Sequence, residues 1–129
     1  MNGRYLLDTN IIIALFAGEE NIQQRLQQVE QVFFSSIVLG ELYYGAENST
    51  RVDTNIQRID EIPSANTIIS CDQETARHYG QIKRSLRAKG RPIPENDIWI
   101  AAHTAQYHLT LAARDEHFKE VDAISWESW

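Results

Sequence analysis

The sequence predicts an α/β fold of three layers, in which a central, mostly parallel sheet of four or five strands lies between two layers of helices. Short apolar runs suited to buried strands alternate with longer segments of helical periodicity along the chain. No repeat, linker or low-complexity segment interrupts this alternation, and 129 residues with 43% hydrophobic composition are a usual size for one core. We therefore expect a single domain over residues 1–129.

The first half of the chain should begin with a strand and then alternate. The predicted elements are a strand over 4–7, a helix over 11–17, a helix over 20–31, a strand over 32–35, a helix over 36–48 and a weaker helix over 51–61. Polar Asp8, Thr9 and Asn10 can cap the first helix, and Gly18 ends it. Pro63 follows the last of these helices.

The second half repeats the alternation. The predicted elements are a strand over 67–70, a helix over 72–89, a helix over 96–107, a strand around 109–111, a short helix over 115–121 and a possible fifth strand over 123–125. In the long helix, Ala76, Tyr79, Ile82 and Leu86 fall on one apolar stripe, and Gly90 terminates it.

Charge and hydropathy narrow the classes of function. The longest apolar run, residues 11–17, is far short of the roughly 20 residues of a membrane helix, and Asp8 interrupts the stretch where a signal peptide needs its apolar core. We therefore expect a soluble cytoplasmic protein with no membrane partner. The single cysteine, Cys71, is expected to be a small core residue in a reducing compartment.

A net charge of −6 argues against a protein that coats nucleic acid, although it does not exclude a nuclease with a local basic track. Five of the nine residues from 83 to 91 are basic. The candidate RNA contacts are Lys83, Arg84, Arg87, Lys89 and Arg91. An ordinary solvated helix face explains the same pattern equally well.

Four acids fall where a parallel sheet places its active crevice, at or near the carboxyl ends of strands. Asp8 follows the first strand, and Asp115 follows the fourth with only Arg114 between. Asp97 opens a helix whose face is expected to pack on the sheet. A helix N-cap is the alternative interpretation for each of these three aspartates.

Glu41 has the strongest physical argument of the four. Its helix is apolar almost all the way round, so we expect it to be buried, and buried glutamates are rare unless they are paired or bind a metal. Two carboxylates about 5 Å apart repel by roughly 3 kcal/mol, and a divalent cation removes that cost. Oxygen ligands favour Mg²⁺ or Mn²⁺, which would activate a water to attack a phosphodiester.

The residues around the four acids carry weaker signals. Thr9 and Asn10 could orient the Asp8 carboxylate or could simply cap the helix, and Glu95 and Glu116 are less favoured additions. The histidines at 78, 103, 108 and 117 show no zinc-ligand spacing and are interpreted as having no role in the site. A receiver-type signalling domain would need an acid beside Asp8 and a lysine after the fourth strand, and both are missing.

At this point the chain resembles the PIN-domain ribonucleases, and among them the VapC toxins of bacterial toxin–antitoxin pairs. The resemblance covers nearly the whole chain and rests on an ordered set of motifs. They are Tyr5-Leu6-Leu7-Asp8-Thr9-Asn10, then Ser35-Ser36-Ile37 with Glu41-Leu42 and Gly45, then Gly90-Arg91-Pro92 before Asp97 and Ile100-Ala101-Ala102, and finally residues 109–114 with Asp115 and Phe118.

The resemblance implies a catalytic and metal-binding set of Asp8, Glu41, Asp97 and Asp115, with Mg²⁺ or Mn²⁺ as cofactor and RNA as substrate. It also implies a homodimer and a VapB antitoxin, which blocks the active site and alone contacts operator DNA. The chain looks most like members that cut tRNA, including initiator tRNA in the anticodon stem-loop. This likeness rests on Ile124-Ser125-Trp126 with Trp129, on Gly80-Gln81-Ile82 and on Gly90-Arg91-Pro92.

One position departs from the resemblance. Many relatives carry Thr or Ser where this chain has Ala113, so a hydroxyl that could orient a carboxylate or water is missing. We expect weaker support for Asp115, which makes it the most dispensable of the four acids. A catalytically weak scaffold that only binds a partner is the remaining alternative.

Overall fold

Five parallel strands form the centre of the protein, in the order β3-β2-β1-β4-β5. The computed structural model describes residues 3–129. The strands are β1 (Arg4–Leu7), β2 (Gln31–Ser35), β3 (Thr67–Ile69), β4 (Thr110–Ala113) and β5 (Ser125–Ser128). The predicted parallel sheet is confirmed, and it has five strands, the larger of the two predicted numbers. β1 is central because its three apolar residues are buried on both faces, as parallel strands require.

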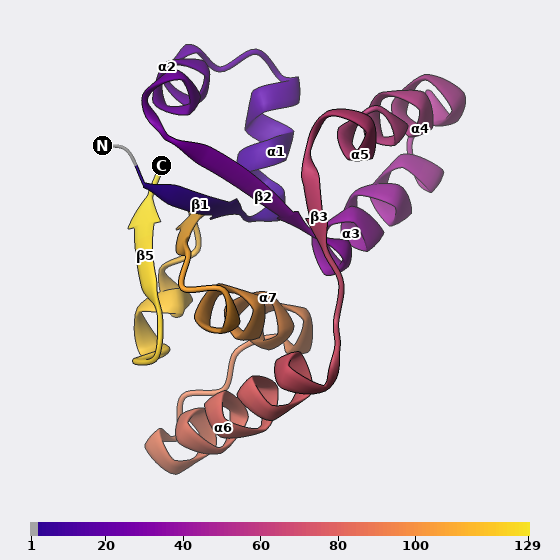
Figure 1. Ribbon diagram of the computed structural model, residues 1–129. Helices are drawn as coiled ribbons and strands as arrows, with labels where there is room; N and C mark the ends of the chain where they lie inside the picture. The colour runs from indigo at the N-terminus through magenta and orange to yellow at the C-terminus, as the bar shows by residue number, and fades with distance from the viewer. Residues whose placement is uncertain (1–2) are drawn as a thin grey trace.

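Helices cover both faces of this sheet (Figure 1). They are α1 (Thr9–Phe16), α2 (Glu20–Gln28), α3 (Ser36–Glu47), α4 (Val52–Asp60), α5 (Ile62–Ala65), α6 (Gln73–Lys89), α7 (Glu95–Gln106) and the 3-10 helix η1 (Glu116–Glu120). α1 and α2 lie on one side of β1, whereas α7 lies on the other side with α6 outside it (Figure 1). No helix in the described part of the chain is both long and apolar enough to cross a membrane.

The strand order determines where a site can form. From β1 the chain proceeds outward to β2 and β3, and it later returns to the opposite side of β1 with β4 and β5. The direction of winding therefore reverses between β1 and β4, where Leu6 pairs with Leu111. In open parallel sheets, such a reversal leaves a crevice at the carboxyl ends of the two strands.

Several predicted boundaries move because tertiary pairing overrides the local pattern. The helix expected over 20–31 ends at Gln28, since Gln31 pairs with Arg4 at the start of β2. The expected fifth strand over 123–125 lies later, at Ser125–Ser128, where it pairs with β4. The short helix expected over 115–121 is the 3-10 helix η1, and Pro63 lies in the first turn of the short helix α5.

The prediction that Cys71 is a core residue is wrong, and the predicted apolar stripe of α6 is buried only in part. Cys71 is exposed, because β3 ends at Ile69 and the thiol lies beyond the sheet. Ala76 is also exposed, and Thr75 is the buried residue at the start of α6. Thr75 forms a capping box with Asp72 at the start of α6, and its side chain is buried there.

Candidate active site

A cavity of about 450 Å³ lies at the reversal between β1 and β4, and all four predicted acids line it. We call it the acidic cavity. Its lining residues are Asp8, Thr9, Asn10, Glu41, Pro94, Glu95, Asn96, Asp97 and Asp115. The four acids come from four separate segments of the chain, so only the folded sheet brings them together.

The aspartate side chains are not used as helix caps. Asp8 occupies the N-cap position of α1 and Asp115 that of η1, yet neither side chain accepts a capping hydrogen bond. Asp97 lies inside the first turn of α7, whose N-cap is Pro94. The backbone N–H of Asp8 donates to the carbonyl of Ala112 in β4 at 2.9 Å, which fixes Asp8 at the end of the sheet. The capping interpretation therefore does not explain these aspartates.

Glu41 is held in place by two hydrogen bonds. The Thr9 hydroxyl donates to one carboxylate oxygen, and the Asn96 side-chain amide donates to the other at 3.3 Å. The Thr9 hydroxyl thus orients the carboxylate of Glu41, whereas the sequence suggested that it would orient the carboxylate of Asp8. The expectation that α3 is buried on all sides is wrong, since Tyr44 is 72% exposed and Glu41 is only partly buried. The buried residues of α3 are confined to Val38, Leu39, Leu42 and Ala46.

The electrostatics of the acidic cavity are unfavourable in the absence of a cation. Asp8 is only 3% exposed, and burial raises its pKa to about 7, with the nearby carboxylates of Asp97, Glu41 and Asp115 adding to the rise. Burial also raises the pKa of Asp97, although the neighbouring His117 partly offsets this. Oxygen donors gathered against their mutual repulsion fit a divalent cation, which supplies the missing positive charge.

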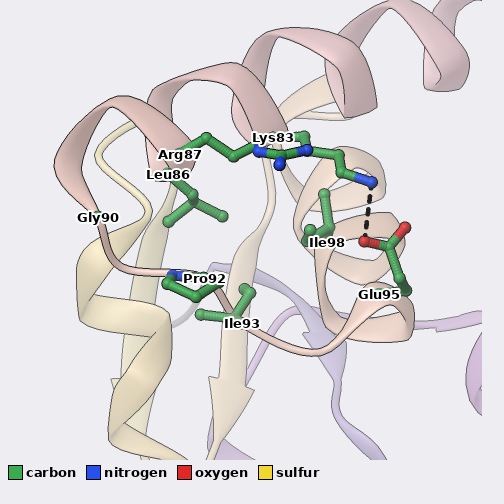
Figure 2. Close-up of a pocket in the computed structure, with 8 residues that line it drawn as sticks. All are labelled: Lys83, Leu86, Arg87, Gly90, Pro92, Ile93, Glu95 and Ile98. Carbon is green, nitrogen blue, oxygen red and sulfur yellow. Dashed lines mark ion pairs between the residues drawn. The ribbon is translucent and has the colours of Figure 1, made fainter.

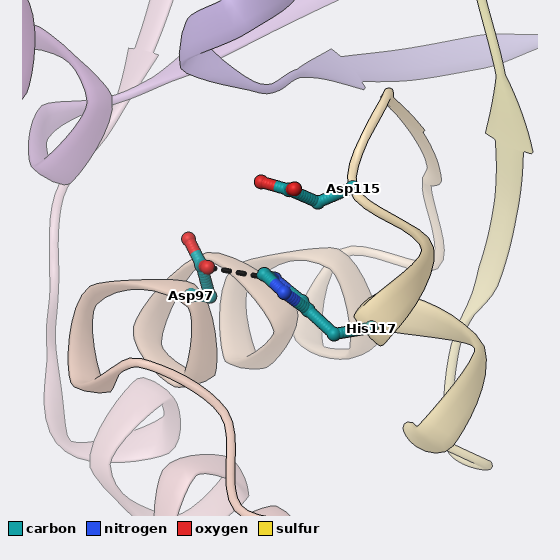
Figure 3. Close-up of side chains that lie close together, drawn as sticks. All are labelled: Asp97, Asp115 and His117. Atoms are coloured by element: carbon teal, nitrogen blue, oxygen red, sulfur yellow. Dashed lines mark ion pairs between the residues drawn. The ribbon is translucent and has the colours of Figure 1, made fainter.

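His117 lies in this cluster, a position that the search for zinc-ligand spacing did not indicate. Its Nε2 atom lies 2.8 Å from Asp97 Oδ2, and the imidazole lies beside both Asp97 and Asp115 (Figure 3). Asp97, Asp115 and His117 form a group of side chains that could hold a metal ion. The only sequence signal was that His117 follows Asp115 by two residues, since zinc-type spacing was the wrong test for a mixed oxygen and nitrogen site.

Two of the five residues of the predicted basic track are ion-paired. The Lys83 ammonium pairs with Glu95 at 3.0 Å, and that of Lys89 pairs with Asp122 at 3.3 Å. Arg87 has no ion pair within residues 3–129. Arg84 and Arg91 are exposed and likewise have no ion pair among the described residues.

Arg87 and Lys83 line a second cavity of about 370 Å³, which we call the basic cavity (Figure 2). Its lining residues are Lys83, Leu86, Arg87, Gly90, Pro92, Ile93, Glu95 and Ile98. Its apolar residues Leu86, Ile93 and Ile98 are themselves buried in the protein. Glu95 lines both this cavity and the acidic cavity, so the two adjoin.

Comparisons with known proteins identify the class to which this parallel α/β sheet with its clustered acids belongs. The model of the PIN domain matches residues 5–124. A curated protein named "Ribonuclease VapC2" from Haemophilus influenzae is 38% identical over 129 residues and covers 98% of each chain. A Salmonella typhimurium protein named "tRNA(fMet)-specific endonuclease VapC" is 31% identical, also over 98% of each chain. The chain therefore belongs to the VapC ribonucleases of the PIN-domain family.

Solved structures agree with this assignment. A VapBC structure from Salmonella typhimurium with bound DNA has a TM-score of 0.89 and 31% identity, covering 100% of this chain and 99% of that one. The VapBC2 structure from Rickettsia felis, bound to a fragment of its promoter, has a TM-score of 0.88 and 30% identity over 98% of each chain.

Proposed function

We propose that this protein is a divalent-metal-dependent endoribonuclease and the toxin of a toxin–antitoxin pair. The observation that carries this proposal is the acidic cavity, where a buried aspartate and three further carboxylates converge at the winding reversal of the sheet. The names of the VapC relatives support ribonuclease activity, and one of them is named for initiator tRNA. We therefore propose tRNA as the substrate, which places the activity in the cytoplasm.

We assign the residues of the acidic cavity as follows. Asp8, Asp97, Glu41 and Asp115 would hold Mg²⁺ or Mn²⁺, which when bound polarises the phosphoryl oxygen and lowers the pKa of a water. Asp8 must lose its proton to bind, and a bound cation would favour the charged form that burial disfavours. Asp115 is exposed and beside Ala113, so we expect it to be the most dispensable of these acids.

The polar residues of the cavity wall keep the carboxylates in place. Thr9 and Asn96 donate to the two oxygens of Glu41, which leaves that carboxylate one orientation across the cavity. The backbone N–H of Thr9 acts to lower the pKa of Asp8, which partly opposes the effect of burial. Asn10 lines the same cavity and is exposed, so it could contact RNA directly.

Purified protein incubated with a tRNA pool and Mn²⁺ is expected to give discrete RNA fragments, with no cleavage when EDTA is in excess. Gel electrophoresis and sequencing of the fragment ends would measure both cleavage and its position. Restoring the divalent cation after EDTA treatment should restore cutting, which controls for damage to the enzyme. If no RNA is cut with any divalent cation, the alternative of a scaffold that only binds a partner is favoured.

We also propose a VapB-type antitoxin, a homodimer, and operator DNA contacts made only through the antitoxin. The VapBC titles of the similar structures support this assembly. An apolar cavity of about 250 Å³ adjoins the acidic cavity through Glu41, and its lining includes Ile13, which is 52% exposed. An exposed apolar surface beside the acids suits a partner segment that blocks them.

Arg87 is proposed to bind the RNA backbone beside the cut. The acidic cavity repels phosphates, whereas Arg87 offers an unpaired guanidinium in the adjoining basic cavity (Figure 2). Lys83 is largely neutralised by Glu95. Of the five residues first considered, Arg87 therefore has the strongest structural support, while Arg84, Lys89 and Arg91 remain peripheral candidates.

Arg87→Ala is expected to raise KM for RNA about fivefold to tenfold and to leave kcat within about twofold, because it removes roughly 1 to 1.4 kcal/mol of phosphate binding. The matched control is Arg77→Ala, since Arg77 is exposed on the same helix, does not line the basic cavity and is not one of the five candidate RNA contacts. Steady-state kinetics at two salt concentrations would measure both effects. Equal changes in the two variants would instead support a solvated helix face without a specific phosphate contact.

A further inference from the structure

We propose that His117 supplies a nitrogen ligand to the divalent cation held by Asp97 and Asp115, and that this ligand makes the site favour Mn²⁺ over Mg²⁺. The inference rests on the proposed function only in taking the cation to be the one that the nuclease uses. It adds a ligand that the four-acid set does not contain.

The contact between His117 and Asp97 has the length expected between two neighbouring ligands of one ion. Its Nε2 atom is 2.8 Å from Asp97 Oδ2, and one ligand atom each from Asp97, Asp115 and His117 lie within 4.8 Å of one another. Two ligands that lie at right angles about 2.1 Å from one ion are themselves about 3 Å apart. The imidazole nitrogen and the carboxylate oxygen thus already have the separation of neighbouring ligands (Figure 3).

His117 Nε2 and Asp97 Oδ2 lie at ion-pair distance, but not in the geometry of an aligned hydrogen bond. His117 Nε2 is buried and has no aligned hydrogen-bond partner among the described residues, although Asp97 is close. A cation between His117, Asp97 and Asp115 would accept the lone pair of the imidazole nitrogen. Its positive charge would also offset the negative charge of the neighbouring carboxylates.

The backbone around His117 holds the imidazole near this position. The next residue, Phe118, is fully buried in the core and anchors η1, and its ring packs against that of His117 with 4.7 Å between centroids. Asp115, two residues earlier, follows β4 with only Arg114 between. Both ends of the short segment that carries His117 are thus fixed by the sheet and the core.

The chemistry of the ligand determines which cation benefits. Mg²⁺ prefers an all-oxygen, near-octahedral shell and keeps several waters, whereas imidazole is a good ligand for the transition metals. Replacing one oxygen by the nitrogen of His117 should therefore strengthen Mn²⁺ binding more than Mg²⁺ binding. The four carboxylates alone would leave the two cations closer in affinity.

The test uses the full chain and Mn²⁺ alone, without RNA. Mn²⁺ affinity is measured from the EPR signal of the free ion, and Mg²⁺ affinity by competition. We expect His117→Ala to weaken Mn²⁺ binding about tenfold or more and Mg²⁺ binding less than about threefold. The matched control is His78→Ala, because His78 lies on α6 and lines neither the acidic cavity nor the Asp97 cluster. Equal losses for the two cations in His117→Ala would overturn the inference.

A spectroscopic measurement tests ligation without a variant. Pulsed EPR of Mn²⁺ bound to the wild-type chain should show a nitrogen coupling, which changes to the ¹⁵N pattern when histidine is ¹⁵N-labelled. Absence of any histidine nitrogen coupling would contradict the proposal even if His117→Ala fails to fold. A nitrogen coupling in a protein that cuts no RNA would support His117 as a ligand while contradicting the proposed nuclease, so the two failures are distinguishable.

Discussion

Replacing Asp97 by asparagine is expected to lower the rate of RNA cleavage by about a thousandfold or more. Asp97 contacts His117 and lines the acidic cavity with the other three acids, so its carboxylate is central to the proposed cation site. A metal ion contributes several kcal/mol to stabilising a phosphoryl transition state, and each 1.36 kcal/mol is a factor of ten in rate. Single-turnover cleavage at saturating Mn²⁺ would measure the loss without the effect of product release.

The control for this substitution is Asp53→Asn, which makes the same chemical change on the exposed side of α4. It should cleave RNA at the wild-type rate. In bacteria, expression of the wild-type chain should arrest growth, and Asp97→Asn should relieve the arrest. Cleavage by Asp97→Asn within about tenfold of wild type, or equal toxicity of the two forms, would refute the assignment of Asp97.

Replacing Asp8 by asparagine is expected to stabilise the metal-free protein at pH 8 while abolishing its activity. Asp8 is buried, and its pKa rises from 3.8 to about 7 in the folded protein. Between these two values the folded state holds a proton that the unfolded state has released. Stability therefore falls as pH rises from about 4 to about 7, by at most about 4 kcal/mol. Asparagine is neutral throughout and removes this loss.

Urea unfolding in EDTA at several pH values would measure the effect. Asp8→Asn should exceed wild type by about 2 to 4 kcal/mol at pH 8, and the difference should shrink towards pH 5. Mn²⁺ should reverse the order at pH 8, because only the wild-type carboxylate gains a cation. Asp53→Asn should follow the wild-type curve at every pH. A metal-free Asp8→Asn that is less stable than wild type at pH 8 would show that the buried charge is not the dominant cost.

Local patterns were sufficient to predict the fold and the strand-end positions of Asp8 and Asp115. The spacing of apolar residues, together with the glycine and polar residues that begin or end elements, located most strands and helices. Examples are β1 and the end of α6 at Gly90. The order of elements then implied parallel strands, and parallel strands imply a crevice at their carboxyl ends. Asp8 and Asp115 were placed near that crevice by their positions directly after strands.

Interactions between distant segments were not predictable in the same way. Periodicity reports which face of an element is apolar, but it does not report what lies across a cavity from a given side chain. The pairing of Lys83 with Glu95 and the hydrogen bond from Thr9 to Glu41 depend on how helices pack on one another. The exposure of Cys71 likewise depends on where β3 ends, which pairing with β2 decides.

The acidic cavity shows the division most clearly. The sequence by itself determined the parallel α/β architecture and placed Asp8 and Asp115 at strand ends, because strand ends are local properties. Glu41, in contrast, was selected on a burial of α3 on all sides that the structure does not show. Only the tertiary structure decided that the aspartates do not cap their helices and that His117 joins Asp97. The physical reason is that a cation site is defined by distances of a few ångströms between side chains, and here those side chains come from segments that meet only when the sheet is assembled.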